Sequence, residues 1–356
     1  MKDILLTIGI PTWNRATDIR TAIDSIVIQL TEDVYKKTEI LVSDNASTDH
    51  TPFVLAEYKI RYPGLISIYR NPQNIGFSGN LDVIVRRAKG EFVLFLSDDD
   101  AVEPDAVKET FFALNKHRDI NVMFLQHWPY NTTLSAPENL EQWTESRKQR
   151  ETGQSCVYYK SGAEFYKAYH SLCNACISGN LFRVEAWKST NMDSGLKSGS
   201  VQLHAAIQIH AKGTSCFITR PVIKYRISSD SGDINTNGDY IKERVGGYDT
   251  GYTFVYFFDL LRACREGQHL YPVWIYRRLS LSCVRGVFYI LLSTKARSLP
   301  INKSYFLTRL NECFDHNYWY WLIPFHRVLI NIPNWLLILP HHLYRLGQTT
   351  YLCIKK

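Results

Sequence analysis

The sequence predicts an α/β fold, in which a mostly parallel β-sheet is flanked by helices and a helical C-terminal region is appended. Short runs typical of strands alternate with patterns typical of helices over the first 126 residues. Beyond residue 240 the chain turns aromatic and helical. The composition, with 45% hydrophobic and 21% charged residues among 356, is that of a globular protein with a packed core.

Five runs in the first part of the chain are rich in branched and aromatic side chains, which favour strands. Helical patterns separate them, and a strand followed by a helical crossover usually continues into a parallel strand. The sequence therefore predicts a parallel sheet with helices on both faces. The expected strands are residues 4–10, 39–43, 65–69, 92–96 and 121–126.

The helices between these strands are predicted from spacing and from their end signals. Residues 17–30 repeat apolar side chains at helical spacing, and residues 51–62 begin with Thr followed by Pro, a common helix start. The helix expected over residues 80–90 closes with Gly90, the residue type that commonly follows a helix. A fourth helix is expected to begin at Pro104.

The remaining chain is expected to form two further regions, residues 127–240 and 241–356. The longest uncharged run of the aromatic tail has 17 residues, whereas a membrane-spanning helix needs about 20 apolar ones. Trp319, Trp321 and Trp335 with flanking basic residues suit helices that lie in a membrane interface. Helices docked on the protein's own core are an equally open alternative.

The charge and the cysteine content indicate which binding partners and which cell compartment to expect. The net charge of +7 is mild and basic residues are spread along the chain, so we expect no nucleic-acid partner but an anionic one, either a nucleotide or a membrane surface. The apolar start of the chain is too short for a signal peptide, and the eight scattered cysteines suit a reducing compartment. Both observations predict a cytoplasmic protein.

Polar segments follow three of the expected strands, at the sheet edge where ligands bind in α/β folds. They read "PTWNR" after the first strand, "DNASTD" after the second and "SDDD" after the fourth. The first turn lacks the glycines that a dinucleotide oxidoreductase or a sugar-phosphate nucleotidyltransferase would need to approach a phosphate group. Both of those enzyme classes are therefore disfavoured.

The "SDDD" segment places three carboxylates side by side, Asp98, Asp99 and Asp100. Like charges in contact raise one another's pKa unless a cation offsets them, and Mg²⁺ or Mn²⁺ accepts such oxygen ligands. The alternative is a charged turn that caps the next helix. Asp44 lies on the same expected rim, where a carboxylate can accept hydrogen bonds from a nucleobase or a ribose, or can simply form a turn.

Five segments in this order resemble the family 2 glycosyltransferases with the GT-A fold, in a form similar to rhamnosyltransferase-like members. They read "IGIPTWNR", "ILVSDNASTDHT", "NIGFSGN", "AKGEFVLFLSDDDAVEPDA" and "PVIKYR", and the resemblance covers residues 4 to about 230. It implies transfer of a sugar from a nucleoside-diphosphate donor to a saccharide hydroxyl. The aromatic and basic tail would suit a lipid-linked acceptor, as in lipopolysaccharide, O-antigen or other cell-surface polysaccharide synthesis.

The resemblance also implies where the donor binds. Residues 1–126 would form the nucleotide-sugar-binding half of the GT-A domain, and residues 127–240 the acceptor half, with residues 228–239 able to close over the donor. The implied nucleotide-sugar-binding residues are Pro11, Thr12, Asn14, Arg15, Asp44, Asn45, Asn74, Gly76, Asn80 and Asp98.

For the metal, the resemblance implies that Asp99 is the direct ligand of Mg²⁺ or Mn²⁺ and that Asp98 and Asp100 support the ribose or the metal. Ser97 stands where the family usually has the first Asp of this motif. These residues would form a clamp for the diphosphate and its cation.

The catalytic base is the main departure from the family. Ser200 and Val201 stand where a Glu-Asp pair is expected, and neither can deprotonate an acceptor hydroxyl. Gln202 is not a base, which leaves His204, whose ordinary pKa of about 6.5 suits that role. The base and the stereochemical course stay open, as does the alternative of a non-catalytic relative that only binds nucleotide sugars.

Overall fold

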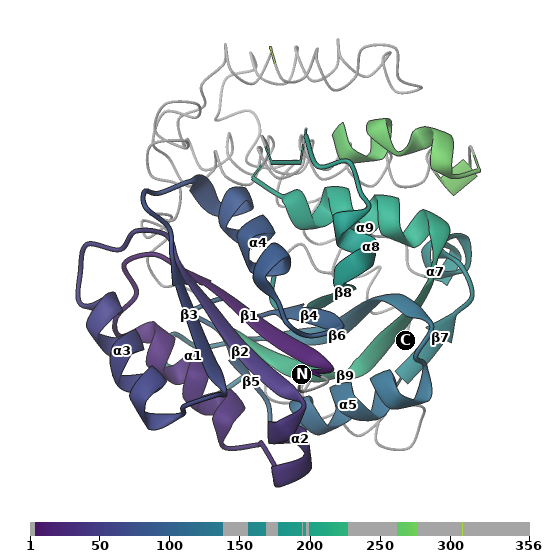
Figure 1. Cartoon of the computed structure of the whole chain (residues 1–356). Helices are drawn as coiled ribbons and strands as arrows, with labels where there is room; N and C mark the ends of the chain where they lie inside the picture. The colour runs from purple at the N-terminus through teal and green to yellow at the C-terminus, as the bar shows by residue number, and fades with distance from the viewer. Residues whose placement is uncertain are drawn as a thin grey trace, which may run out of the picture. The chain divides into compact units, whose positions relative to one another are not determined.

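The computed structural model describes residues 4–137, 156–168, 177–193, 195–196, 199–226, 262–272, 274–275 and 308. The chain divides into two compact units, Met1–Thr236 and Asn237–Lys356. The first unit carries the sheet, shown in Figure 1. The loop expected at residues 228–239 and the aromatic tail fall outside the described residues, and so the expectations for them stay predictions.

The first unit contains the α/β fold that the sequence predicts. Its sheet has 9 strands in the order β3-β2-β1-β4-β8-β6-β9-β5, with β7 paired to β9. All five expected strands are present, and β1, β2, β3, β4, β6 and β9 run in one direction. The strands are β1 (Leu6–Thr12), β2 (Thr38–Asp44), β3 (Ile66–Arg70), β4 (Phe92–Phe95), β5 (Ala101–Val102), β6 (Ile120–Tyr130), β7 (Cys156–Tyr159), β8 (Asn180–Arg183) and β9 (Thr214–Arg226).

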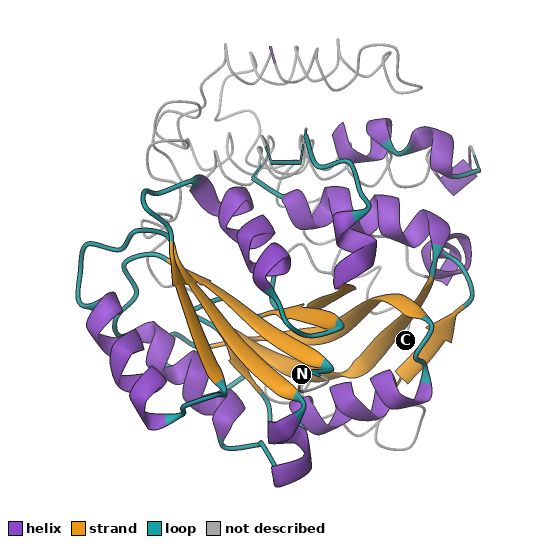
Figure 2. Cartoon of the chain, in the orientation of Figure 1, coloured by secondary structure: helices purple, strands orange, loops and turns teal. Residues whose placement is uncertain are grey.

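Helices cover both faces of the sheet, as Figure 2 shows. The apolar sides of α1, α3 and α5 share one buried cluster with the strands. On the other face α4 packs against β1, α8 and α9. The helices of this unit are α1 (Asp18–Val27), α2 (Glu32–Lys36), α3 (Thr51–Arg61), α4 (Gly76–Arg87), α5 (Ala106–Lys116), α7 (Gly162–Ala168), α8 (Val184–Lys188) and α9 (Val201–Lys212).

Gly90 does not terminate a helix, contrary to the sequence-based expectation. Helix α4 ends at Arg87 and its C-cap is Ala88. A Cβ atom on Gly90 would lie 2.5 Å from the backbone nitrogen of Thr7 and 2.8 Å from the carbonyl oxygen of Phe92. Glycine is therefore needed at this position because a side chain would collide with the backbone of β1 and with the first residue of β4.

No helix in the described parts of the chain is long and apolar enough to cross a membrane. In the second unit the described residues include the short 3₁₀ turn η2 (Gln268–Leu270).

His210 of α9 is buried in an aromatic cage. Its ring centroid lies 4.6 Å from that of Phe165 and 5.4 Å from those of Phe124 and Tyr166. The side chain is 0% exposed, and burial lowers the pKa of His210 to about 3. The imidazole is therefore neutral in the folded protein at every pH near neutrality.

We expect His210 to make folding stability depend on pH. Below about pH 6.5 the unfolded chain binds a proton on this residue and the folded chain does not, so stability falls as the pH drops from 6.5 towards 3. At pH 5 the loss from this residue amounts to about 2 kcal/mol. Urea unfolding at pH 7 and pH 5 should show a smaller difference for His210→Gln than for the wild type. Equal differences would contradict the assignment.

Candidate active site

A pocket opens where the carboxyl ends of β1, β2 and β4 meet. It is formed by the turn after β1, the loop after β2, the first turns of α4 and the residues after β4. The structure thus brings Pro11, Thr12, Asn45, Asn80 and Asp98, which the sequence singled out, to one place. The lining residues are Pro11, Thr12, Trp13, Asn45, Phe77, Asn80, Ser97 and Asp98.

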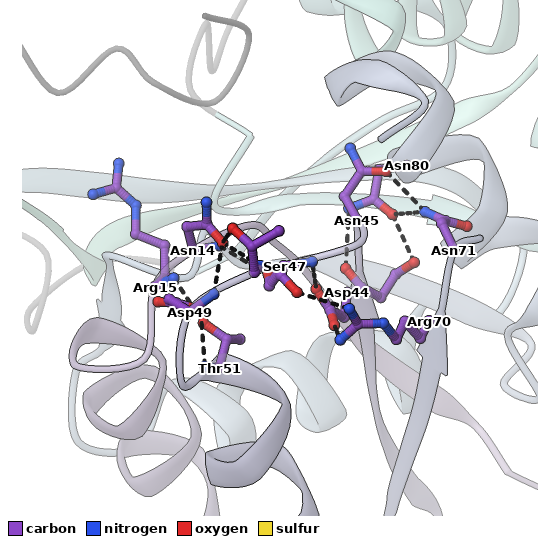
Figure 3. Close-up of polar contacts among 12 residues, drawn as sticks. Asn14, Arg15, Asp44, Asn45, Ser47, Asp49, Thr51, Arg70, Asn71 and Asn80 are labelled. Atoms are coloured by element: carbon purple, nitrogen blue, oxygen red, sulfur yellow. Dashed lines mark hydrogen bonds and ion pairs between the residues drawn. The ribbon is translucent and has the colours of Figure 1, made fainter. Parts of the chain in front are cut away.

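Asn14 and Arg15 connect the first turn to the loop after β2, as Figure 3 shows. Asn14 has a positive φ of 55°, and its Oδ1 accepts a hydrogen bond of 2.7 Å from the backbone nitrogen of Thr48. Its own backbone nitrogen donates to Ser47 Oγ, and that of Arg15 donates to Thr51 Oγ1. These contacts hold the two rim loops together, and contact of either residue with a ligand stays a prediction.

Asp44 is 1% exposed at the end of β2, and both of its oxygens have partners within the protein. Oδ1 accepts a hydrogen bond of 2.8 Å from the backbone nitrogen of Ser47, and Oδ2 forms a 2.9 Å ion pair with Arg70. A carboxylate has about four acceptor positions, so these contacts leave it able to accept further hydrogen bonds.

Arg70 was not singled out from the sequence, although the signal was present. The last residue of β3 lies beside the last residue of β2 in the sheet register, and the two carry opposite charges. Arg70 also donates 2.7 Å to the carbonyl oxygen of Ser47, while its side chain remains 48% exposed. A cationic group is therefore fixed at the rim next to Asp44.

Asn45, Asn71 and Asn80 form a network of asparagine side chains, shown in Figure 3, and Asn45 also donates to Asn74. Asn80 is further bonded to Ser43 in β2. Asn45 and Asn80 are each 2% exposed and Asn71 is 3% exposed, so these three side chains are buried, whereas Asn74 is exposed. Asn71 was missed by the sequence analysis, because nothing in its neighbourhood marks it as different from an ordinary turn residue.

Asp98 lines the pocket beside Thr12. The Asp98 side chain is 4% exposed, and no hydrogen-bond partner meets its Oδ2 atom among the described residues. Burial, together with the negative charge of Asp99, raises the pKa of the Asp98 carboxyl to about 7, while a hydrogen bond from the Thr12 hydroxyl acts in the opposite direction. A buried carboxylate that its surroundings satisfy only in part therefore lines the pocket, as expected where a ligand with hydroxyl groups or a cation binds.

The other two aspartates are placed differently. Asp100 is 2% exposed and accepts hydrogen bonds from the Ser178 hydroxyl and from the backbone nitrogen of Arg226, 2.9 Å away. Burial and the charge of Asp99 raise its pKa well above the ordinary value. Asp99 is only half-buried, and its Oδ1 accepts from the Ser97 hydroxyl. Of the two, Asp99 has the more accessible carboxylate.

Arg226 ties the aspartate segment to the end of β9. Its Nε atom donates 2.6 Å to the carbonyl oxygen of Asp99, and its guanidinium lies 3.5 Å from a carboxylate oxygen of Asp18 in α1. The short strand β5, directly after the aspartates, pairs with β9 at Ile223 and Lys224. Strand β9 therefore holds the aspartate segment in place, through the side chain and backbone of Arg226 and through its pairing with β5.

The candidate base His204 lies on α9 and is 2% exposed, and it is not among the residues that line the pocket. The start of α9 is close to the pocket, however, because the backbone nitrogen of Val201 donates to Ser78 Oγ in α4 at 3.4 Å. Ser78 lies between Phe77 and Asn80, which line the pocket. The role of His204 as a base stays a prediction.

The residues fit a cation only if a ligand completes its coordination. In the described ranges, no group of three or more His, Cys, Asp or Glu side chains is placed to hold an ion alone. The unpartnered Asp98 Oδ2 and the accessible carboxylate of Asp99 nevertheless offer oxygen ligands of the kind that Mg²⁺ and Mn²⁺ prefer. Further oxygens would have to come from a bound diphosphate and from water.

Residues 7–170 match the family model described as glycosyl transferase family 2. The poly(ribitol-phosphate) beta-glucosyltransferase of Bacillus spizizenii is 29% identical over 119 residues, which cover 33% of this chain and 18% of that protein. The first curated relatives are likewise matched over 32% of their own length.

Solved structures share the architecture. The S. aureus TarS 1-349 structure in complex with UDP-GlcNAc superposes with a TM-score of 0.60 at 13% identity, covering 97% of this chain and 92% of that one. A mannosyltransferase of Pyrobaculum calidifontis in complex with GDP-Man and Mn²⁺ has a TM-score of 0.51 at 16% identity, covering 92% and 85% of the two chains. At these identities the likeness establishes the fold alone.

Proposed function

The chain belongs to glycosyl transferase family 2 through residues 7–170 and has the GT-A fold, and we propose that it transfers a sugar from a nucleoside diphosphate to a saccharide hydroxyl. The observation that carries this proposal is the pocket on the rim of the sheet. The buried carboxylate of Asp98 lines this pocket, and the charged pair of Asp44 and Arg70 lies on the same rim. Ribose and sugar hydroxyls are donors that such carboxylates can bind.

Each end of the donor has residues suited to it. Asp44 keeps acceptor positions for the N–H group of a nucleobase, and Arg70 beside it can donate to a base carbonyl. Asp99 would hold Mg²⁺ or Mn²⁺ with support from Asp98 and Asp100, and the cation, when bound, offsets the charge on the leaving diphosphate. The similar structures, one in complex with UDP-GlcNAc and another with GDP-Man and Mn²⁺, support this arrangement.

We propose a lipid-linked saccharide or surface polymer as the acceptor. A relative named for glucosylation of poly(ribitol-phosphate) supports a cell-surface polymer. Residues 127–240 would form the acceptor side, and residues 241–356 would hold the protein at the cytoplasmic face of the membrane. Deletion of residues 318–356 should then lower activity on a lipid-linked acceptor more than on a soluble one.

A second reading is a relative that binds nucleotide sugars without turnover. The observation that favours it is the pair Ser200 and Val201, which stand where the family's base is expected and cannot accept a proton. The same binding pocket serves both readings. They differ in turnover, for which His204 is the proposed base.

A ligand screen tests the proposed donor site. UDP-, GDP-, CDP- and dTDP-sugars are added to the full chain with Mn²⁺ or with EDTA, and the thermal unfolding midpoint is recorded. A ligand at 100 times its Kd should stabilise the protein by about 2.7 kcal/mol, and EDTA should reduce the shift. Donor hydrolysis is then measured with the stabilising sugar nucleotide, and binding without turnover would support the second reading. If none of the four classes stabilises the protein, the proposed function is wrong.

A further inference from the structure

We infer that Asn71 is a positioning residue for donor binding, because its side-chain amide bridges the two asparagines that line the pocket and holds them in place. Asn71 is not a pocket-lining residue and is 3% exposed. The inference deepens the proposed function and rests on it. The role of Asn71 depends on which groups around these asparagines can only donate a hydrogen bond and which can only accept one.

Asn45 has its orientation set by the backbone. The backbone nitrogen of Ile75 can only donate, and it lies 3.0 Å from Asn45 Oδ1. On its other side, Asn45 Nδ2 donates 2.8 Å to Asn74 Oδ1 and 3.3 Å to the carbonyl oxygen of Gly76. Asn74 Oδ1 is itself identified as an acceptor by the backbone nitrogen of Gly76 at 2.9 Å. A rotated Asn45 amide would face each of these groups with the wrong atom.

Asn71 must therefore present its nitrogen to Asn45. Its Nδ2 atom donates 3.0 Å to Asn45 Oδ1 and 2.9 Å to Asn80 Oδ1, so that both of its hydrogens are used. The backbone nitrogen of Asn71 also donates 2.9 Å to the carbonyl oxygen of Asp44, which holds the residue in place. One amide nitrogen thus links two side chains that come from different elements, the loop after β2 and helix α4.

This network decides which hydrogen-bonding groups of Asn45 and Asn80 remain free to bind a ligand. Asn45 accepts two hydrogen bonds and donates two, so its side chain is saturated. Asn80 accepts from Asn71 and from the Ser43 hydroxyl, and it donates one N–H to the Ser43 carbonyl oxygen at 3.0 Å. Asn80 therefore offers the ligand one N–H donor and no acceptor.

Asn71 and the Ser43 carbonyl oxygen together hold the Asn80 amide in this orientation. Asn80 lines the pocket together with the carboxylate of Asp98. A ligand oxygen, from a hydroxyl, carbonyl or phosphate group, is what the free N–H of Asn80 binds. If the amide of Asn80 shifted or turned over, this donor would be lost and binding would weaken.

Asn71→Asp is the sharpest test, because the side chain keeps its shape and loses both donated hydrogens. A carboxylate oxygen would then take the place of Nδ2 and face both Asn45 Oδ1 and Asn80 Oδ1. Asn71→Ala, which removes the donors without adding charge, is the second variant in case the first does not fold. Asn115→Asp, on the exposed surface of α5, controls for the added charge.

The experiment measures Kd by calorimetry for UDP, GDP, CDP and dTDP with Mn²⁺, using the full chain. We expect at least a tenfold weaker Kd for both Asn71 variants and no change for Asn115→Asp. Helical content and a cooperative unfolding transition should be retained. In an Asn80→Ala background the effect of Asn71→Ala should shrink to less than threefold, because Asn71 acts mainly through Asn80.

The possible results distinguish a wrong role for Asn71 from a wrong proposed function. If a nucleotide binds the wild type and folded Asn71 variants equally well, the positioning role is wrong and the donor site stands. The same holds if the Asn71→Ala effect is undiminished in the Asn80→Ala background. If none of the four nucleotides binds the wild type, the proposed function and the positioning role are both wrong.

Discussion

Asp99→Asn is expected to lower metal-dependent turnover about 100-fold, which corresponds to about 3 kcal/mol of transition-state stabilisation. Asp99 is half-buried, and its Oδ1 accepts from the Ser97 hydroxyl, so an isosteric amide can keep that contact and the fold. What the variant loses is the negative charge that would bind Mg²⁺ or Mn²⁺ at the diphosphate. Donor hydrolysis with Mn²⁺ and with EDTA measures the effect.

The matched control is Asp33→Asn. Asp33 is exposed on the short helix α2, which precedes β2 and so lies away from the carboxyl ends of the strands. Its replacement should leave both turnover and the EDTA response unchanged. An Asp99→Asn protein that turned over donor at the wild-type rate, with the same EDTA sensitivity, would exclude Asp99 as the metal ligand.

The sequence predicts the first half of the sheet well because local signals and topology agree there. β1, β2, β3 and β4 are apolar runs separated by helical patterns, and all of them pair in parallel, β1 with β2, β2 with β3 and β1 with β4. β8 and β9 are different, because β8 inserts antiparallel between β4 and β6, and β9 carries register shifts along its pairing with β6. Such pairing depends on distant segments and leaves little trace in a local pattern.

The candidate site was likewise predictable in part from the sequence. The position of the rim follows from the rule that ligands bind at the carboxyl ends of parallel strands, and the pocket lies there. The roles of individual side chains do not follow, because hydrogen bonds across the fold decide them. Asn45 looks like a binding residue in the sequence, yet its amide is saturated, whereas Asn71 controls the network without lining the pocket. Asp100 is similarly engaged with Ser178.

Three adjacent carboxylates also illustrate how burial separates residues that look alike in sequence. Asp98 and Asp100 are both almost completely buried, and burial raises the pKa of each. Asp100 is compensated by the Ser178 hydroxyl and the backbone of Arg226, but Asp98 Oδ2 has no such partner among the described residues. The protein therefore keeps an unfavourable buried oxygen where the ligand would bind.

Asp98→Asn should for that reason make the ligand-free protein more stable and the donor site weaker. An unpartnered buried polar group costs about 1–3 kcal/mol, and the neutral amide removes the charge while keeping the shape. We expect the unfolding free energy at pH 8 to rise by about 1–2 kcal/mol. The affinity for the stabilising nucleotide should fall about tenfold or more, since a hydrogen bond to a charged group contributes about 1.5–3 kcal/mol.

The stability difference between Asp98→Asn and the wild type should depend on pH, whereas a change in packing alone would not. Burial raises the pKa of Asp98 to about 7, well above that of an unfolded Asp, so the wild type loses stability as the pH rises from about 4 to 7 and the carboxyl ionises in the fold. Asp98→Asn lacks this loss, and its advantage over the wild type should therefore be larger at pH 8 than at pH 5. Urea unfolding at both pH values checks it, with Asp33→Asn as control. An Asp98→Asn variant that is less stable than the wild type at pH 8 and binds nucleotide equally well would show that Asp98 is a structural carboxylate. If Asp98 instead serves to bind a ligand, removal of its charge should stabilise the ligand-free protein.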